Sequence, residues 1–134
     1  MFQYPLTGLV TMISLFIFFW MAMRVGKARR AHDIKAPAHD GPEDFLRVIR
    51  VYENTHEMLV LYLPALWLCA LTISDFWTAI IGIFFPIGRI IYALGYYQAA
   101  DKRGRGFMIG FMATIALMIG ATIGLLHAAY AIYS

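Results

Sequence analysis

The chain has 134 residues, of which 61% are hydrophobic and 14% charged, with a formal net charge of +3. This composition, with a mean hydropathy of +0.68, excludes an ordinary soluble domain and indicates a membrane protein. Because a spanning helix needs roughly 20 mostly apolar residues, the length allows about four spans and leaves no room for a separate soluble domain. We therefore expect a single all-α domain, residues 1–134.

Four stretches of the chain are apolar and long enough to cross a bilayer. The first has no basic residue before it and no small-residue cleavage site, so we expect a retained helix and not a signal peptide. Together the four stretches predict an integral, multi-pass four-helix bundle. They are residues 6–23, 58–74, 76–100 and 107–131.

Most basic residues flank the ends of these stretches. Under the positive-inside rule, the loop of residues 27–40 and the turn of residues 101–105 face the cytoplasm, and both termini lie on the opposite side. This distribution explains the pI of about 9.2 without a nucleic-acid partner, so we expect none. The residues concerned are Arg24, Lys27, Arg29, Arg30, Lys35, Lys102, Arg103 and Arg105.

Neither a disulfide nor a metal site is expected. Cys69 is the one cysteine, and we interpret it as a packing residue because its apolar neighbours do not stabilise a thiolate. His32 and His39 lie in the charged loop and His127 near the end of the last span. No two of these histidines have the spacing of a metal-ligand pair on a helix.

The second helix is predicted to begin well before the membrane. Asp40 or Gly41 can cap it, with Pro42 in its first turn, and it runs to about Thr72. Pro64 in this helix and Pro86 in the third each remove a backbone hydrogen bond, and we expect a bend at both.

A polar stripe follows one face of the second helix. Arg47, Arg50, Asn54 and Glu57 are spaced by three, four and three residues, so all lie within a sector of roughly 80°. Glu57 directly precedes an apolar run, which places it at or just below the membrane surface. An ionisable group is costly there unless it is paired.

The third span carries a matching stripe of Arg89, Tyr92 and Tyr96, and Arg89 is its only charge. Exposing this guanidinium to lipid would cost about 3 kcal/mol. One interpretation is a purely structural ion pair between Arg89 and Glu57. The other is a cleft, open to the cytoplasm, that binds a small peptide with several carboxylates beside an apolar wall for a lipophilic second substrate. Its lining would come from the two stripes and from Arg103 and Arg105.

Three segments carry a family resemblance. They are Pro42-Glu43-Asp44-Phe45, the run from Arg47 to Glu57 followed by Tyr62-Leu63-Pro64, and Gly88-Arg89-Ile90-Ile91-Tyr92-Ala93-Leu94-Gly95-Tyr96. In this order within four spans, they resemble the membrane-associated proteins in eicosanoid and glutathione metabolism. The resemblance implies a homotrimer with glutathione bound between neighbouring subunits on the cytoplasmic side. The short loops resemble those of the bacterial branch, which implies a bacterial inner membrane.

The resemblance also implies roles for individual residues. Arg103 or Arg105, at the start of the fourth helix, would stabilise the glutathione thiolate, and the spacing from Arg103 to Gly106 favours Arg103. Arg24 would be the contact from the first helix. The other glutathione-binding residues that the resemblance implies are Arg50, Asn54, Glu57, Tyr92 and Tyr96. The two polar stripes add Arg47 and Arg89 to this set.

Departures from the family narrow the expected activity. Tyr92 and Gly106 stand where the prostaglandin synthase type has His and Ser, so we expect glutathione transfer or peroxide reduction on lipophilic substrates. Two alternatives use the same fold. One is a non-catalytic membrane binder of lipid or glutathione conjugates, and the other is a small proton-coupled exporter with Glu57 as carrier, which a fixed Arg89 partner disfavours.

Overall fold

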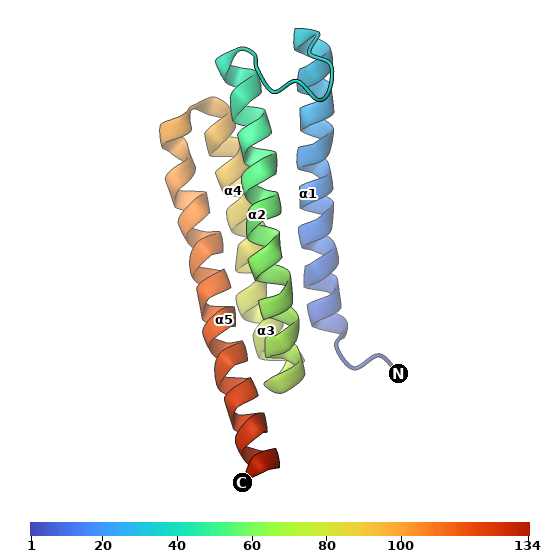
Figure 1. The fold of residues 1–134 in the computed structure, drawn as a ribbon, viewed down its shortest axis with the longest axis vertical. Coiled ribbons are helices and arrows are strands. Elements are labelled where there is room, and N and C mark those ends of the chain that lie inside the picture. The colour runs from blue at the N-terminus through green and yellow to red at the C-terminus, as the bar shows by residue number, and fades with distance from the viewer.

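The computed structural model describes residues 1–134 as an all-helical chain (Figure 1). Four stretches of helix are long and apolar enough to cross a membrane, at Pro5–His32, Glu43–Thr72, Asp75–Gln98 and Ala100–Tyr133. The prediction of an integral, multi-pass protein with four spans is therefore confirmed. The elements in order are α1 (Pro5–His32), α2 (Glu43–Thr72), α3 (Asp75–Gly82), α4 (Phe84–Gln98), the short 3₁₀ helix η1 (Ala100–Arg103) and α5 (Gly104–Tyr133).

The long helices run side by side as one bundle (Figure 1). The loop from α1 to α2 and the turn at η1 lie at the same end of the bundle, here called the loop end, and both chain termini lie at the other. The last turns of α5 extend past the other helices. The two basic connections therefore share one end of the bundle, as the charge pattern predicted.

The third span is broken three residues before Pro86, and α2 repairs the break. Pro86 has no N–H to donate to the carbonyl of Gly82 four residues earlier, and α3 ends at Gly82. The Tyr62 hydroxyl group donates a hydrogen bond to that carbonyl at 2.9 Å, and its ring stacks on Phe85 at 3.9 Å between centroids. The interruption expected at Pro86 is thus present, whereas α2 continues through Pro64.

Close packing of α4 on α5 fixes the geometry near the loop end. A Cβ atom at Gly106 would lie 2.5 Å from the Cα atom of Tyr92 and 2.6 Å from the Gly88 carbonyl oxygen. Only a residue without a side chain allows this approach. The start of α5 is therefore held against the backbone of Tyr92.

The start of α2 is fixed differently from the expectation. Pro42 is the N-cap of α2 and no side chain caps the helix, so the predicted caps Asp40 and Gly41 are wrong by one or two residues. At the opposite end of the bundle, Asp75 accepts hydrogen bonds from the backbone N–H groups of Leu6 and Thr7, at 3.1 and 2.8 Å. This carboxylate ties the start of α1 to the start of α3.

Candidate functional site

A cavity of about 160 Å³ lies at the loop end between α2, α4 and the start of α5. Its lining brings together five of the residues that the sequence singled out, contributed by three different spans. This set comes from both predicted stripes and from the turn after the third span. We call this space the arginine cavity. Its lining residues are Arg50, Asn54, Tyr92, Tyr96, Arg103 and Phe107.

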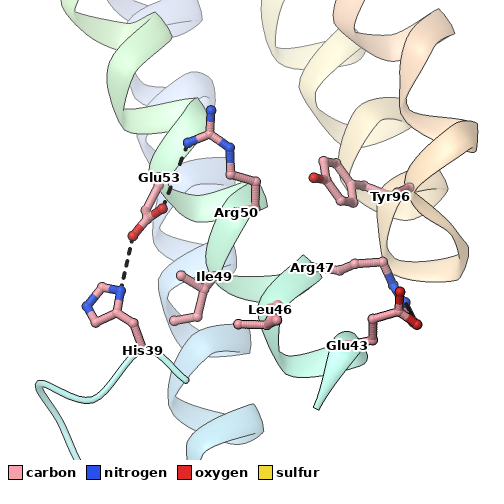
Figure 2. Close-up of a pocket in the computed structure, with 9 residues that line it drawn as sticks. His39, Glu43, Leu46, Arg47, Ile49, Arg50, Glu53 and Tyr96 are labelled. Atoms are coloured by element: carbon pink, nitrogen blue, oxygen red, sulfur yellow. Dashed lines mark ion pairs between the residues drawn. The ribbon is translucent and has the colours of Figure 1, made fainter. Parts of the chain in front are cut away.

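A second hollow, of about 400 Å³, borders the arginine cavity because the two share Arg50 and Tyr96. We call it the outer hollow, and Figure 2 shows the residues that line it. Arg50 of α2 and Tyr96 of α4 lie on opposite sides of the outer hollow (Figure 2). Arg47 also lines this outer hollow, with its Nη1 atom 4.0 Å from Glu43. Glu53 lies between His39 at 3.3 Å and Arg50 at 3.8 Å. The outer hollow is therefore rich in charge and leads from the loop end to the arginine cavity.

Arg89 lies beneath the cavity and is 1% exposed. Its Nη2 atom donates to Asn54 Oδ1 at 2.9 Å and to Thr55 Oγ1 at 2.8 Å, and its Nε atom donates to the same Thr55 oxygen at 3.2 Å. The guanidinium carbon is 3.8 Å from the centroid of the Tyr92 ring, a cation–π contact. Two neutral oxygens and an aromatic face therefore surround this buried cation, while its Nη1 atom has no hydrogen-bond partner.

The predicted ion pair between Arg89 and Glu57 is wrong. Glu57 contacts Arg50 and Asn54 of its own helix, and its side chain is 57% exposed. The residues of α2 that reach α4 at this level are Asn54 and Thr55. Thr55 was missed because it is one residue off the polar stripe, although a hydroxyl group beside Asn54 is the available signal for a second acceptor.

The contact with Arg89 sets the orientation of Asn54. With Oδ1 accepting from Arg89, the Nδ2 atom faces the other way and donates to Glu57 Oε2 at 3.4 Å. The second Glu57 oxygen lies 3.3 Å from Arg50 Nη1. A chain of polar contacts thus runs from the buried Arg89 to the half-exposed Arg50 at the mouth of the cavity.

Arg103, from the turn after the third span, lies on the aromatic side of the cavity. Tyr92 packs edge-on against Tyr96 with 5.5 Å between ring centroids. The guanidinium carbon of Arg103 is 5.4 Å from the centroid of Tyr96, and Arg103 Nη1 donates to the Ala100 carbonyl at 2.9 Å. Arg105 is exposed and does not line the cavity. Of the two arginines named from the sequence, Arg103 is the one at the cavity.

Arg24 lies apart from both spaces. Its guanidinium carbon is 4.5 Å from the centroid of the Tyr97 ring, and it lines a different hollow beside α1. The structure therefore does not bring Arg24 together with Arg50 or Arg103. The arginine cavity itself offers guanidinium groups, an amide and phenol hydroxyl groups, which are donors for carboxylates or for a thiolate.

Comparison with known proteins gives consistent matches. The sequence model of the MAPEG family matches residues 7–123. The chain is 42% identical over 119 residues to an uncharacterized protein of Synechocystis, covering 89% of this chain and 87% of that protein. It is 32% identical over 105 residues to microsomal glutathione S-transferase 2 of Mus musculus, covering 78% of this chain and 71% of that protein. It is 31% identical over 124 residues to leukotriene C4 synthase of Cavia porcellus, covering 92% of this chain and 83% of that protein.

Proposed function

The chain belongs to the MAPEG family, as the sequence segments suggested, and on that basis we propose that it is a glutathione transferase or peroxidase. Its relatives include proteins named glutathione S-transferase and leukotriene C4 synthase, which support a glutathione-related function in the membrane. In this proposal, the protein activates the glutathione thiol for attack on lipophilic electrophiles or hydroperoxides. Residues 1–134 form the single domain that does so.

The observation that carries the proposal is the position of Arg103 in the arginine cavity with Arg50, Asn54 and two tyrosines. A free thiol has a pKa of about 8.5. A nearby guanidinium favours the thiolate, and lowering the pKa by two units requires about 2.7 kcal/mol of preferential stabilisation. Arg103 would supply it, with the hydroxyl group of Tyr96 or Tyr92 as an additional donor.

The rest of the tripeptide would be held by the charged groups around the mouth. Arg47 and Arg50 suit its carboxylates because guanidinium groups bind carboxylates in bidentate fashion. Glu57 suits its amine. Arg89 would act through Asn54 and Thr55 and not through direct contact, since it is buried beneath the cavity.

We further propose that the functional unit is a homotrimer. Arg50 and Glu57 remain 47% and 57% exposed in the single protomer, and Glu57 directly precedes the apolar residues of α2. Leaving such groups open to lipid is unfavourable. A neighbouring protomer would cover them and complete a site between two chains, and closed cyclic symmetry gives each chain an equivalent site.

The proposed setting is a bacterial inner membrane with the site facing the cytoplasm. Both basic connections lie at the loop end (Figure 1), and positive residues favour the cytoplasmic side. Glutathione would then enter from the cytoplasm through the outer hollow, and the lipophilic substrate would enter from the bilayer.

The test is an ultraviolet difference titration of bound glutathione, which follows the thiolate absorbance against pH. For the wild-type protein we expect thiolate well below the free-thiol pKa of about 8.5. Arg103→Ala should return the titration toward that value with little loss of binding, while Arg105→Ala should leave it unchanged. Binding without any thiolate below about pH 8 would contradict thiol activation and would favour a non-catalytic binder. A monodisperse monomer that still conjugates glutathione would contradict the trimer.

A further inference from the structure

One face of α1 that the proposed reaction does not use forms a groove against α4. Its walls are Phe16, Ile17 and Trp20 of α1 with Ile90 and Leu94 of α4, and its volume is about 300 Å³. All five residues are apolar, and both helices belong to membrane-spanning segments. This apolar groove suits a hydrocarbon chain and offers nothing to a polar ligand.

A separate, polar hollow lies on the same face of α1, closer to the loop end. It measures about 310 Å³, and its charged lining consists of Arg24, Lys27, His32 and Asp44. Because Trp20, Arg24 and Lys27 are four and three residues apart, they share one face of the helix. We call this space the basic hollow. It lies directly above the apolar groove on the path along α1 toward the loop end.

Tyr97 connects the two spaces. Its ring packs edge-on against Trp20 at 6.0 Å between centroids, and the Arg24 guanidinium carbon lies 4.5 Å from its centroid. Trp and Tyr side chains favour the membrane–water interface, where basic side chains extend toward the head groups. The change from apolar groove to basic hollow therefore coincides with the depth at which a phospholipid changes from chain to head group.

The charges of the basic hollow are not balanced within the chain. Asp44 is the only acidic residue of the lining, and it is engaged by His32 at 3.1 Å. Neither Arg24 nor Lys27 has a carboxylate within 4.0 Å. Arg24 and Lys27 are thus two cations at the membrane interface that are available to pair with an anion from outside the protein.

We propose that the basic hollow and the apolar groove together bind one anionic glycerophospholipid of the membrane. Its phosphate group lies between Arg24 and Lys27, and one acyl chain follows the groove past Trp20. Phe16 and Arg24 are separated by about 12 Å along the helix axis, which fits within the roughly 15 Å depth of one leaflet of the hydrocarbon core. Basic pockets between spans are known settings for such head groups. This site shares no residue with the arginine cavity.

Trp20 provides a fluorescent probe inside the groove. The double substitution Trp67→Phe and Trp77→Phe leaves it as the only tryptophan. This variant is reconstituted in phosphatidylcholine vesicles that contain increasing fractions of phosphatidylglycerol with dibrominated acyl chains, or the same fractions of dibrominated phosphatidylcholine. We expect half-maximal quenching of Trp20 at a mole fraction of brominated phosphatidylglycerol at least fivefold lower than that of brominated phosphatidylcholine.

Substitution of the cations tests where the preference originates. Lys27→Gln should reduce the preference for phosphatidylglycerol about fivefold, the contribution of one basic residue at a membrane surface. Arg24→Gln should do the same, and Lys27 serves as the safer variant because it makes no contact comparable to that of Arg24 with Tyr97. Lys35→Gln, which removes a basic residue outside the hollow, should leave the preference unchanged.

Three outcomes would overturn the proposal. Equal quenching by the two brominated lipids would mean that the groove only samples bulk lipid. Absence of quenching by either would mean that another protein surface covers the groove. A preference that survives Lys27→Gln, or that Lys35→Gln reduces equally, would assign the selectivity to the overall positive charge of this face.

Discussion

Arg89 Nη2 donates a hydrogen bond to Asn54 Oδ1 at 2.9 Å, and this contact determines which end of the amide faces Glu57. The oxygen of Asn54 is used toward the protein interior, so its NH₂ group is directed outward. A side chain that is 1% exposed thereby controls a donor at the edge of the arginine cavity. If the cavity binds glutathione as proposed, Arg89 would be a positioning residue that acts through Asn54 of α2.

Thr55 should be as important to this arrangement as Asn54, because its oxygen accepts from two nitrogens of Arg89. Thr55→Val removes that acceptor and leaves part of a buried guanidinium unsatisfied. We expect the free energy of unfolding to fall by about 2 to 4 kcal/mol, measured by denaturation in mixed micelles. Thr55→Ser keeps the hydroxyl group and should stay within about 1 kcal/mol of wild type. Equal losses for the two variants would contradict the hydrogen-bond explanation.

Glu57 is predicted to bind the amine of glutathione. Glu57→Gln removes the negative charge while keeping the shape, and we expect Kd for glutathione to rise about tenfold or more, since a charged hydrogen bond contributes about 1.5 to 3 kcal/mol. Isothermal titration calorimetry measures this directly. N-acetylglutathione has no cationic amine, so its Kd should be the same for both proteins. If its affinity also falls, Glu57 acts by holding Arg50, its partner at 3.3 Å.

The contact of α5 with the Tyr92 backbone should tolerate no side chain. Gly106→Ala places a methyl group against the backbone of Tyr92 and Gly88, which forces α4 and α5 apart at a cost of about 1 to 3 kcal/mol. We expect a lower melting temperature and weaker glutathione binding. Gly104→Ala is the matched control because a Cβ atom there meets nothing within 4 Å. Identical behaviour of the two variants would show that the helices adjust freely.

The hydrogen bond that the Tyr62 hydroxyl group donates to the Gly82 carbonyl should contribute measurably to stability. Tyr62→Phe leaves the Gly82 carbonyl without the donor that replaces the missing N–H of Pro86. We expect a loss of about 1 to 3 kcal/mol of stability, measured by thermal unfolding. Tyr52 lies in the same helix, and its ring stacks on Phe18. Tyr52→Phe removes the hydroxyl group but keeps this ring, so it should have little effect on stability. A larger loss for Tyr52→Phe would contradict the assignment.

The sequence predicts the spans and much of the cavity because both depend on periodicity. Hydropathy over about 20 residues identifies a span, and spacings of three and four place Arg50 beside Asn54 and Tyr92 beside Tyr96 on their helices. The structure brings these four residues together with Arg103 in one cavity. Their proposed roles in glutathione binding stay predictions until binding is measured.

The partner of Arg89 is not predictable in the same way. Residues 54, 55 and 57 of α2 all lie near the level of Arg89, and the choice among them depends on the rotation of α2 about its own axis. That rotation is decided by packing, including the seating of Tyr62 on Phe85, which no local pattern encodes. The α2 cap was missed for a related reason, since the loop of residues 33–42 is placed by contacts such as His32 with Asp44.

The repair of the third span by α2 has a consequence for how the protein is made. The segment of α3 and α4 brings into the bilayer two groups that lipid cannot solvate, the Gly82 carbonyl and the Arg89 guanidinium. The partners of both come from α2, through Tyr62 for the first and through Asn54 and Thr55 for the second. We therefore expect the second and third spans to enter the bilayer as one unit, a helical hairpin. A nascent chain that releases α2 into lipid alone would strand the next segment at the exit, so the short turn at Ser74 keeps the two halves of this hairpin within reach of each other from the start.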